Sequence, residues 1–115
     1  MEEGRFYNAA VLIDRLGNKV GEYRKIRPTI SEIEEQGITP GPFEAPVFET
    51  DFGKIGIQIC FDIEWSDGWQ QLKAKGAEIV FWPSAFSGGK KVNTMAWLNG
   101  YPVVSSTGKK HYENL

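Results

Sequence analysis

The feature that most constrains the fold is the alternation of strand-like and helix-like segments between residues 54 and 106. A strand is predicted where apolar residues run together or alternate, and a helix where apolar residues recur at a spacing of three or four. The predicted order is strand 54–60, helix 66–73 capped by Ser66 or Asp67, strand 77–82 stopped by Pro83, helix 92–98 and strand 102–106. This alternation is typical of an α/β sheet with right-handed crossovers.

The first half of the chain has hairpin signals instead. The apolar run Ala9–Ile13 lies within a predicted strand at 6–14, and its unbroken character predicts a strand covered on both faces. A turn at 16–18 leads to a return strand at 19–23, and residues 46–50 and 54–60 form a second predicted hairpin. Between these hairpins, Pro and Gly residues predict a long loop at 26–45, with a short helical turn around 31–36.

Composition excludes several classes of protein. The chain has 115 residues with 13 Lys and Arg against 15 Asp and Glu, a net charge of −2, so neither nucleic acid nor a membrane surface is an expected partner. It has no apolar run of the length of a membrane span and no secretory signal, which predicts a soluble, cytoplasmic location. With one cysteine, Cys60, and one histidine, His111 in a polar tail, no metal site or cofactor is predicted.

Two chemically reactive side chains fall at the predicted carboxyl ends of strands, where α/β sheets bind ligands: Lys25 and Cys60. Cys60 lies on the strand face opposite the isoleucines and precedes a predicted helix, so it has the position of a nucleophile at a strand-to-helix turn. The alternative is a small buried apolar residue. Because the histidine is in the tail, the base for Cys60 must be another group, and a carboxylate is the obvious substitute.

Lys25 lies in a basic run whose neighbours, Arg24 and Arg27, are expected to be solvated. A lysine next to a cysteine nucleophile holds the thiolate and stabilises a developing oxyanion. Of the tryptophans, Trp69 and Trp97 at helical positions are predicted to be core residues, and Trp65 is predicted to face the substrate.

Five segments resemble the nitrilase, or carbon–nitrogen hydrolase, superfamily, in order and with similar spacing. They are Tyr-Arg-Lys-Ile-Arg-Pro at 23–28, Gly-Ile-Thr-Pro-Gly at 37–41, residues 46–56, Ile-Cys-Phe-Asp at 59–62 and Gly-Ala-Glu-Ile-Val-Phe-Trp-Pro-Ser-Ala at 76–85. The resemblance runs from about residue 6 to residue 107. It implies a four-layer αββα sandwich with a Glu-Lys-Cys triad.

The resemblance also implies roles for particular residues. Cys60 is the expected nucleophile, and Lys25 and the Phe61 N–H are the expected oxyanion donors. Glu32 is the expected second glutamate, which positions substrate or water, with Glu34 as the alternative and a solvated loop face as the ordinary explanation for both. The expected reaction is hydrolysis of a non-peptide carbon–nitrogen bond in a small amide, carbamoyl compound or nitrile.

Two departures from the family pattern qualify these expectations. Arg27-Pro28 replaces the more common histidine, and the family's general-base glutamate precedes the strand that matches 6–14. We therefore expect 1–115 to be a single partial domain lacking amino-terminal elements and the carboxyl end, inactive alone and forming homo-oligomers through an exposed sheet edge. The alternatives are a non-catalytic domain that binds a ligand or partner subunit, and an acyl-transfer or ammonia-supplying relative.

Overall fold

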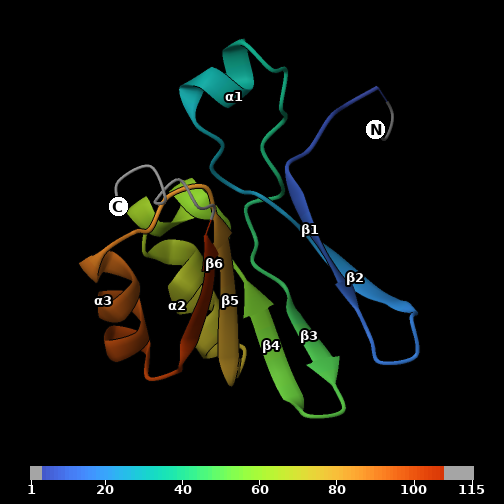
Figure 1. The fold of residues 1–115 in the computed structure, drawn as a ribbon, viewed down its shortest axis with the longest axis vertical. Helices are drawn as coiled ribbons and strands as arrows, with labels where there is room; N and C mark the ends of the chain where they lie inside the picture. Colours follow the sequence, from blue (N-terminus) through green and yellow to red (C-terminus); the bar gives the residue numbers. More distant parts are fainter. Residues whose placement is uncertain (1–3, 108–115) are drawn as a thin grey trace, which may run out of the picture.

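The fold is built on a four-stranded sheet (Figure 1). The computed structural model describes residues 4–107. In spatial order the strands are β3 (Val47–Thr50), β4 (Gly53–Ile57), β5 (Ile79–Ser84) and β6 (Val103–Thr107). Strands β3 and β4 form an antiparallel hairpin, whereas β4, β5 and β6 run parallel. The predicted alternation of strands and helices is therefore confirmed, with helices in the connections between the parallel strands.

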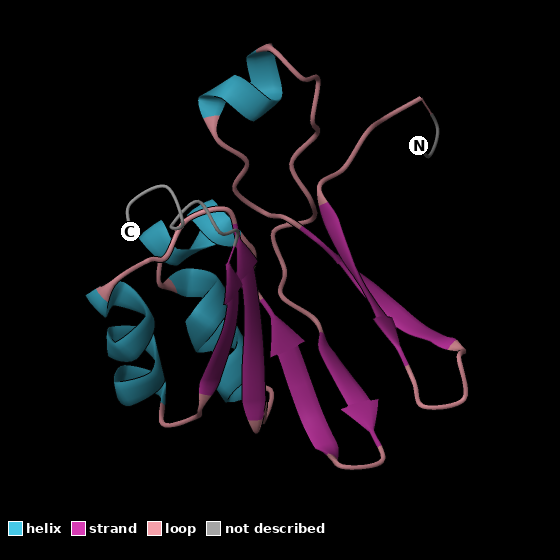
Figure 2. Cartoon of the chain, in the orientation of Figure 1, coloured by secondary structure: helices cyan, strands magenta, loops and turns pink. Residues whose placement is uncertain are grey.

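Helices lie on one side of this sheet and a second hairpin on the other side (Figure 2). The crossover helices are α2 (Asp67–Ala74) and α3 (Lys90–Asn99). The hairpin consists of β1 (Ala9–Ile13) and β2 (Lys19–Arg24), which form a separate two-stranded sheet. Two short helices complete the structure: α1 (Ile30–Glu34) and the 3₁₀ helix η1 (Cys60–Glu64). None of the helices between residues 4 and 107 has the length and apolar character needed to cross a membrane.

The main core lies between the four-stranded sheet and α2. Trp69 and Leu72 of α2 are completely buried, as are Val80 and Trp82 of β5. The helix approaches the sheet closely at Gly56, where a Cβ would lie 2.6 Å from the Leu72 Cδ2 atom. A larger residue at this position would push α2 away from the sheet, so the glycine sets the spacing between these two layers.

The prediction that the first strand is covered on both faces is wrong. In β1, Val11 and Ile13 are each 53% exposed, while Ala10 and Leu12 on the other face are partly buried. The hairpin belongs to a two-stranded sheet, and only one of its faces packs against the other described residues. An unbroken apolar run therefore indicates a strand here without indicating what covers it.

Two further predictions from local sequence are wrong. Strand β5 continues through Pro83 to Ser84. Its pairing with β4 ends at Phe81, so beyond that residue β5 pairs with β6 alone. The other edge of β5 is unpaired there, and a proline, which has no N–H, is tolerated at such an edge. Trp97 is 83% exposed on α3, since Val92 and Met95 are the residues of that helix that pack against the core. Trp69, by contrast, is a core residue as predicted.

Ser66 does not cap α2 through its side chain. Its neighbour Asp67, the first residue of the helix, accepts a hydrogen bond from the Arg27 guanidinium at 2.5 Å. The start of α2 is therefore tied to the loop that follows β2.

Candidate active site

Cys60 stands at a sharp turn between β4 and η1. Its φ is +43°, the one positive value among the described residues other than glycine. A side chain rarely adopts this conformation, and such strain is retained where surrounding contacts hold it, often at functional sites. One such contact is the hydrogen bond that the buried Trp82 Nε1 donates to the Cys60 carbonyl at 3.0 Å. The half-buried thiol is thus presented at a strained strand-to-helix turn, as expected for a nucleophile.

Lys25 follows the end of β2 and is fixed through both its backbone and its amine. Its N–H donates to the Asn8 carbonyl at 2.7 Å, and its carbonyl accepts from the Gly41 N–H at 2.8 Å. The side chain is only 2% exposed, and Nζ lies 2.7 Å from Glu32 Oε1. A buried ammonium requires such a counter-charge, so Lys25 and Glu32 form a fixed ion pair.

Glu32 is held by three donors from separate parts of the chain. Besides Lys25, the Thr29 N–H donates to Oε1 at 2.8 Å and the Asn8 Nδ2 donates to Oε2 at 2.7 Å. Burial works to raise the pKa of Glu32, but Lys25, Thr29 and Asn8 outweigh it and lower this pKa to about 2. Glu32 is therefore a carboxylate at neutral pH, suited to holding Lys25 and positioning a ligand and poorly suited to accepting a proton.

These side chains surround one cavity. It has a volume of about 730 Å³, within the range of pockets that bind small molecules. Lys25, Glu32 and Cys60 all line it, so the structure brings together the three residues predicted to be catalytic. The remaining lining residues are Asn8, Ala9, Ala10, Val11, Thr29, Gln36, Ile59, Pro83, Ser84 and Ala85.

Phe61 and Trp65, the residues predicted to contact substrate, are not in the lining of this cavity. Their rings make an edge-to-face contact with centroids 5.0 Å apart, and the Arg27 guanidinium lies 4.6 Å from the Trp65 ring centroid. The Phe61 N–H is one of the first in η1, and such groups have no acceptor within their own helix. Glu34, the alternative to Glu32, is exposed on α1.

Sequence reasoning missed Asn8 and Thr29. For Thr29 a signal was present, because Thr-Ile-Ser-Glu at 29–32 matches the capping-box pattern, and Thr29 and Glu32 do make both of its hydrogen bonds. Asn8 had no such signal, since it is 24 residues from Glu32 and meets it only in the fold.

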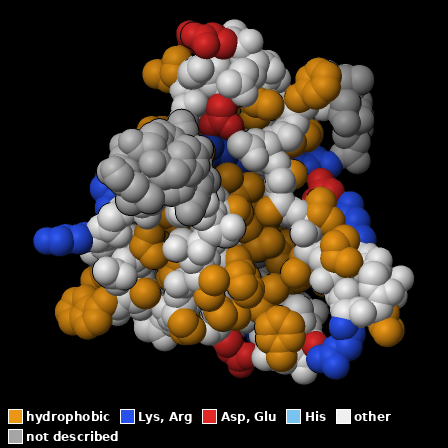
Figure 3. Space-filling model, viewed as in Figure 1, with side chains coloured by type: hydrophobic (Ala, Val, Ile, Leu, Met, Phe, Trp, Pro, Cys, Tyr) orange, Lys and Arg blue, Asp and Glu red, His pale blue; other side chains and the backbone are white. Residues whose placement is uncertain are grey.

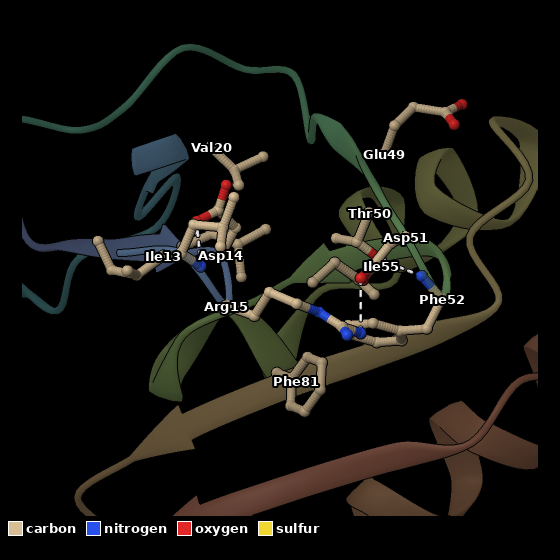
Figure 4. Close-up of a pocket in the computed structure, with 12 residues that line it drawn as sticks. Ile13, Asp14, Arg15, Val20, Glu49, Thr50, Asp51, Phe52, Ile55 and Phe81 are labelled. Carbon is tan, nitrogen blue, oxygen red and sulfur yellow. Dashed lines mark hydrogen bonds and ion pairs between the residues drawn. The ribbon is translucent and has the colours of Figure 1, made fainter. Parts of the chain in front are cut away.

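A second cavity lies away from Cys60, between the β1–β2 hairpin and strands β3 to β5. It has a volume of about 760 Å³, with walls that include Leu12, Val20, Ile55 and Phe81 (Figure 4). An ion pair between Arg15 and Asp51 is present at one side. These walls offer mainly apolar contacts and contain neither a cysteine nor a lysine, so this cavity is not the candidate active site.

The described residues contain no group of three or more His, Cys, Asp or Glu side chains arranged to hold a metal ion. His111, predicted to be a solvated tail residue, lies outside the described residues.

Comparisons with known proteins bear on the family and the fold of the chain. The model of the carbon–nitrogen hydrolase family matches residues 1–115. The chain is 44% identical over 82 residues to a probable hydrolase, YhcX, of Bacillus subtilis, covering 71% of this chain and 16% of that protein. It is 38% identical over 90 residues to the deaminated glutathione amidase of Bos taurus, covering 71% of this chain and 27% of that enzyme.

A solved structure shows the same fold. Nit3 of Saccharomyces cerevisiae, a member of branch 10 of the nitrilase superfamily, superposes with a TM-score of 0.80 at 23% identity. The match covers 93% of this chain and 41% of Nit3, so the chain spans less than half the length of the proteins that it resembles here. The helix layer, the four-stranded sheet and the opposing hairpin are thus part of a nitrilase-type αββα sandwich, and the chain belongs to the carbon–nitrogen hydrolase family.

Proposed function

We propose that the protein acts on a small amide, carbamoyl compound or nitrile, with Cys60 as nucleophile and Lys25 and Glu32 as its partners. The observation that carries this proposal is the single cavity lined by a thiol, a buried ammonium and an ionised carboxylate. Membership of the carbon–nitrogen hydrolase family supports the type of bond that is broken.

For an amide substrate, Cys60 Sγ attacks the carbonyl carbon while a carboxylate base takes the thiol proton. The oxyanion accepts hydrogen bonds from Lys25 Nζ and the Phe61 N–H, which stabilise the tetrahedral intermediate. The base then delivers its proton to the nitrogen, ammonia or an amine leaves, and a thioester remains. Water attacks the thioester in the same way, releasing the acid and restoring the thiol.

Glu32 has a positioning role in this proposal. It is already engaged by three donors, and its pKa of about 2 makes it a weak base. We therefore propose that the general base comes from outside residues 1–115 and that 1–115 alone, as a partial domain, has no hydrolase activity. The Glu32 carboxylate would keep the Lys25 ammonium oriented toward the substrate and prevent the ammonium from adopting other positions.

The test uses a longer protein that contains residues 1–115, with ammonia release measured on a panel of small aliphatic amides, ureido acids and nitriles. We expect turnover by the wild type and loss of about 10³-fold or more in Cys60→Ala and Lys25→Met. The matched control is Lys73→Met on α2, remote from the cavity, which should keep wild-type activity. Near-wild-type activity in Cys60→Ala would contradict the proposal.

A second candidate function is a non-catalytic domain that binds a ligand. The Lys25–Glu32 ion pair favours this candidate as well. Even in the absence of a general base, its charged groups line a cavity of about 730 Å³ and could bind a polar ligand there. Ammonia release by residues 1–115 alone would contradict it, and so would failure of all the amides, ureido acids and nitriles to bind in calorimetry.

We also propose that the chain associates with a second copy of itself. Hydrophobic side chains gather on the face where the β1–β2 hairpin meets β3 to β5 (Figure 3). The exposed ones there include Ile13, Leu16, Val20 and Phe52. Contiguous exposed apolar surface favours association. Light scattering across a concentration series tests this, and a monomer at every concentration would contradict it.

A further inference from the structure

Asp62, two residues after Cys60, has a completely enclosed carboxylate that accepts three hydrogen bonds. The side chain of this residue is not in the lining of the Cys60 cavity, and the residue is 2% exposed. Its Oδ2 accepts from the Tyr23 hydroxyl at 2.5 Å and from the Ile59 N–H at 2.9 Å. Its Oδ1 accepts from the Arg27 N–H at 2.9 Å.

The three donors to Asp62 come from the segments that contain Lys25 and Cys60. Tyr23 and Arg27 are two residues before and two residues after Lys25, and Ile59 immediately precedes Cys60. One carboxylate therefore joins both sides of the lysine segment to the start of the cysteine turn. Since a carboxylate is planar and all its donors are buried or partly buried, these two segments have little freedom to shift relative to each other.

The Tyr23 hydroxyl strengthens this connection. While it donates to Asp62, it accepts a hydrogen bond from the Ile26 N–H at 3.1 Å, so it also holds the residue directly after Lys25. Both Tyr23 and Ile26 are buried. The lysine is thus fixed from both sides through one tyrosine and one aspartate.

The placement of Asp62 is costly for the fold. Burial raises the pKa of Asp62, although hydrogen bonds from Tyr23, Ile59 and Arg27 lower it. Buried charges of this kind contribute little net stability compared with apolar residues of the same size. Because Asp62 adds little to the stability of the fold but joins the Lys25 and Cys60 segments, its role is better explained by the geometry that it imposes on them.

We propose that Asp62, together with Tyr23, is a positioning residue that fixes the Lys25 ammonium relative to the Cys60 thiol. This inference rests on the proposed function in one respect, namely that Lys25 and Cys60 act as a pair. Neither Asp62 nor Tyr23 contacts the substrate in this scheme. Both act through the residues that flank the pair.

The experiment measures how strongly Lys25 promotes the reaction of Cys60 with iodoacetamide. Cys60 is the single cysteine, so alkylation of residues 1–115 at neutral pH, followed by mass spectrometry, reports this thiol alone. A positive charge held near a cysteine promotes its reaction as a nucleophile, so Lys25→Met should slow alkylation about tenfold at neutral pH. In the Asp62→Asn and Tyr23→Phe backgrounds, the same Lys25→Met change should slow it less than about threefold.

Tyr101→Phe is the matched control for Tyr23→Phe. The Tyr101 hydroxyl donates to the Trp69 carbonyl at 2.9 Å and is buried, so both changes remove one buried, hydrogen-bonded hydroxyl. Both should lower stability, as followed by thermal unfolding. Only Tyr23→Phe should weaken the effect of Lys25→Met on alkylation, which separates positioning from a general loss of stability.

The outcomes distinguish this inference from the proposed function. If Lys25→Met leaves the rate of alkylation unchanged in the wild-type background, the Lys25–Cys60 pair and the positioning role are both overturned. If the tenfold effect is present and persists fully in Asp62→Asn and Tyr23→Phe, the positioning role alone is overturned. Should Asp62→Asn fail to fold by circular dichroism, the Tyr23→Phe result decides.

Discussion

The Glu32 carboxylate receives hydrogen bonds from the Lys25 ammonium, the Thr29 N–H and the Asn8 amide. Glu32→Gln keeps the size of the side chain while removing its charge and replacing one acceptor oxygen with a donor. The ammonium, on a lysine side chain that is 2% exposed, then lacks its counter-charge. We therefore expect Glu32→Gln to lower the free energy of unfolding at neutral pH.

The size of this loss follows from the pKa of Glu32, which is lowered from 4.5 to about 2. A tenfold change in an acid dissociation constant corresponds to about 1.4 kcal/mol, so the lower pKa is worth roughly 3 kcal/mol in total. We expect about 2 kcal/mol, because solvent still reaches part of the carboxylate and screens it. A carboxyl group with a lowered folded-state pKa stabilises the fold above its unfolded pKa, and this contribution disappears as the pH falls through the folded pKa.

Urea unfolding followed by tryptophan fluorescence measures the effect between pH 7 and pH 2. The free energy of unfolding of Glu32→Gln should be about 2 kcal/mol lower than that of the wild type at pH 7, and this difference should approach zero as the pH falls toward 2. Glu34→Gln makes the same chemical change at an exposed position of α1 and should stay within about 0.5 kcal/mol of wild type throughout. A Glu32→Gln difference that remains constant down to pH 2 would refute the reasoning.

Three further substitutions test the packing. Trp69→Ala should cost about 3–5 kcal/mol in chemical denaturation, because Trp69 is completely buried against the sheet. Gly41→Ala should be destabilising and should alter Cys60 alkylation, since a Cβ there would lie 2.3 Å from the Arg24 carbonyl oxygen, and unchanged stability would contradict the close approach. Trp97→Ser should change the free energy of unfolding by less than about 0.5 kcal/mol, because Trp97 is 83% exposed, and a larger loss would show that the side chain packs.

Local patterns predicted the element types well and their surroundings less well. The hairpins and crossover helices were predicted from apolar spacing, glycine and proline, signals that act over a few residues. What covers a strand or helix face depends on elements far along the chain. The exposed Val11 and Trp97 and the continuation of β5 through Pro83 therefore differ from the predictions.

The same division holds for the candidate site. Lys25 and Cys60 were identified as residues at strand ends, because strand boundaries are local and their chemistry is distinctive. The hydrogen bond from Asn8 to Glu32 and the three that Asp62 accepts were not predicted. These contacts join segments 24 to 39 residues apart, or depend on a tight turn whose geometry the sequence alone does not specify.

By itself, the sequence determined the order of strands and helices, the family resemblance and the identity of the reactive side chains, because these depend on residue type and short-range spacing. Only the tertiary structure decided that Lys25, Glu32 and Cys60 line one cavity, and that the Glu32 carboxylate accepts hydrogen bonds from three donors. It alone placed Asp62 between the lysine and cysteine segments. The physical reason is that hydrogen bonds and charge pairs depend on distance in space, and that distance is set by how the fold brings together segments that lie far apart in the chain.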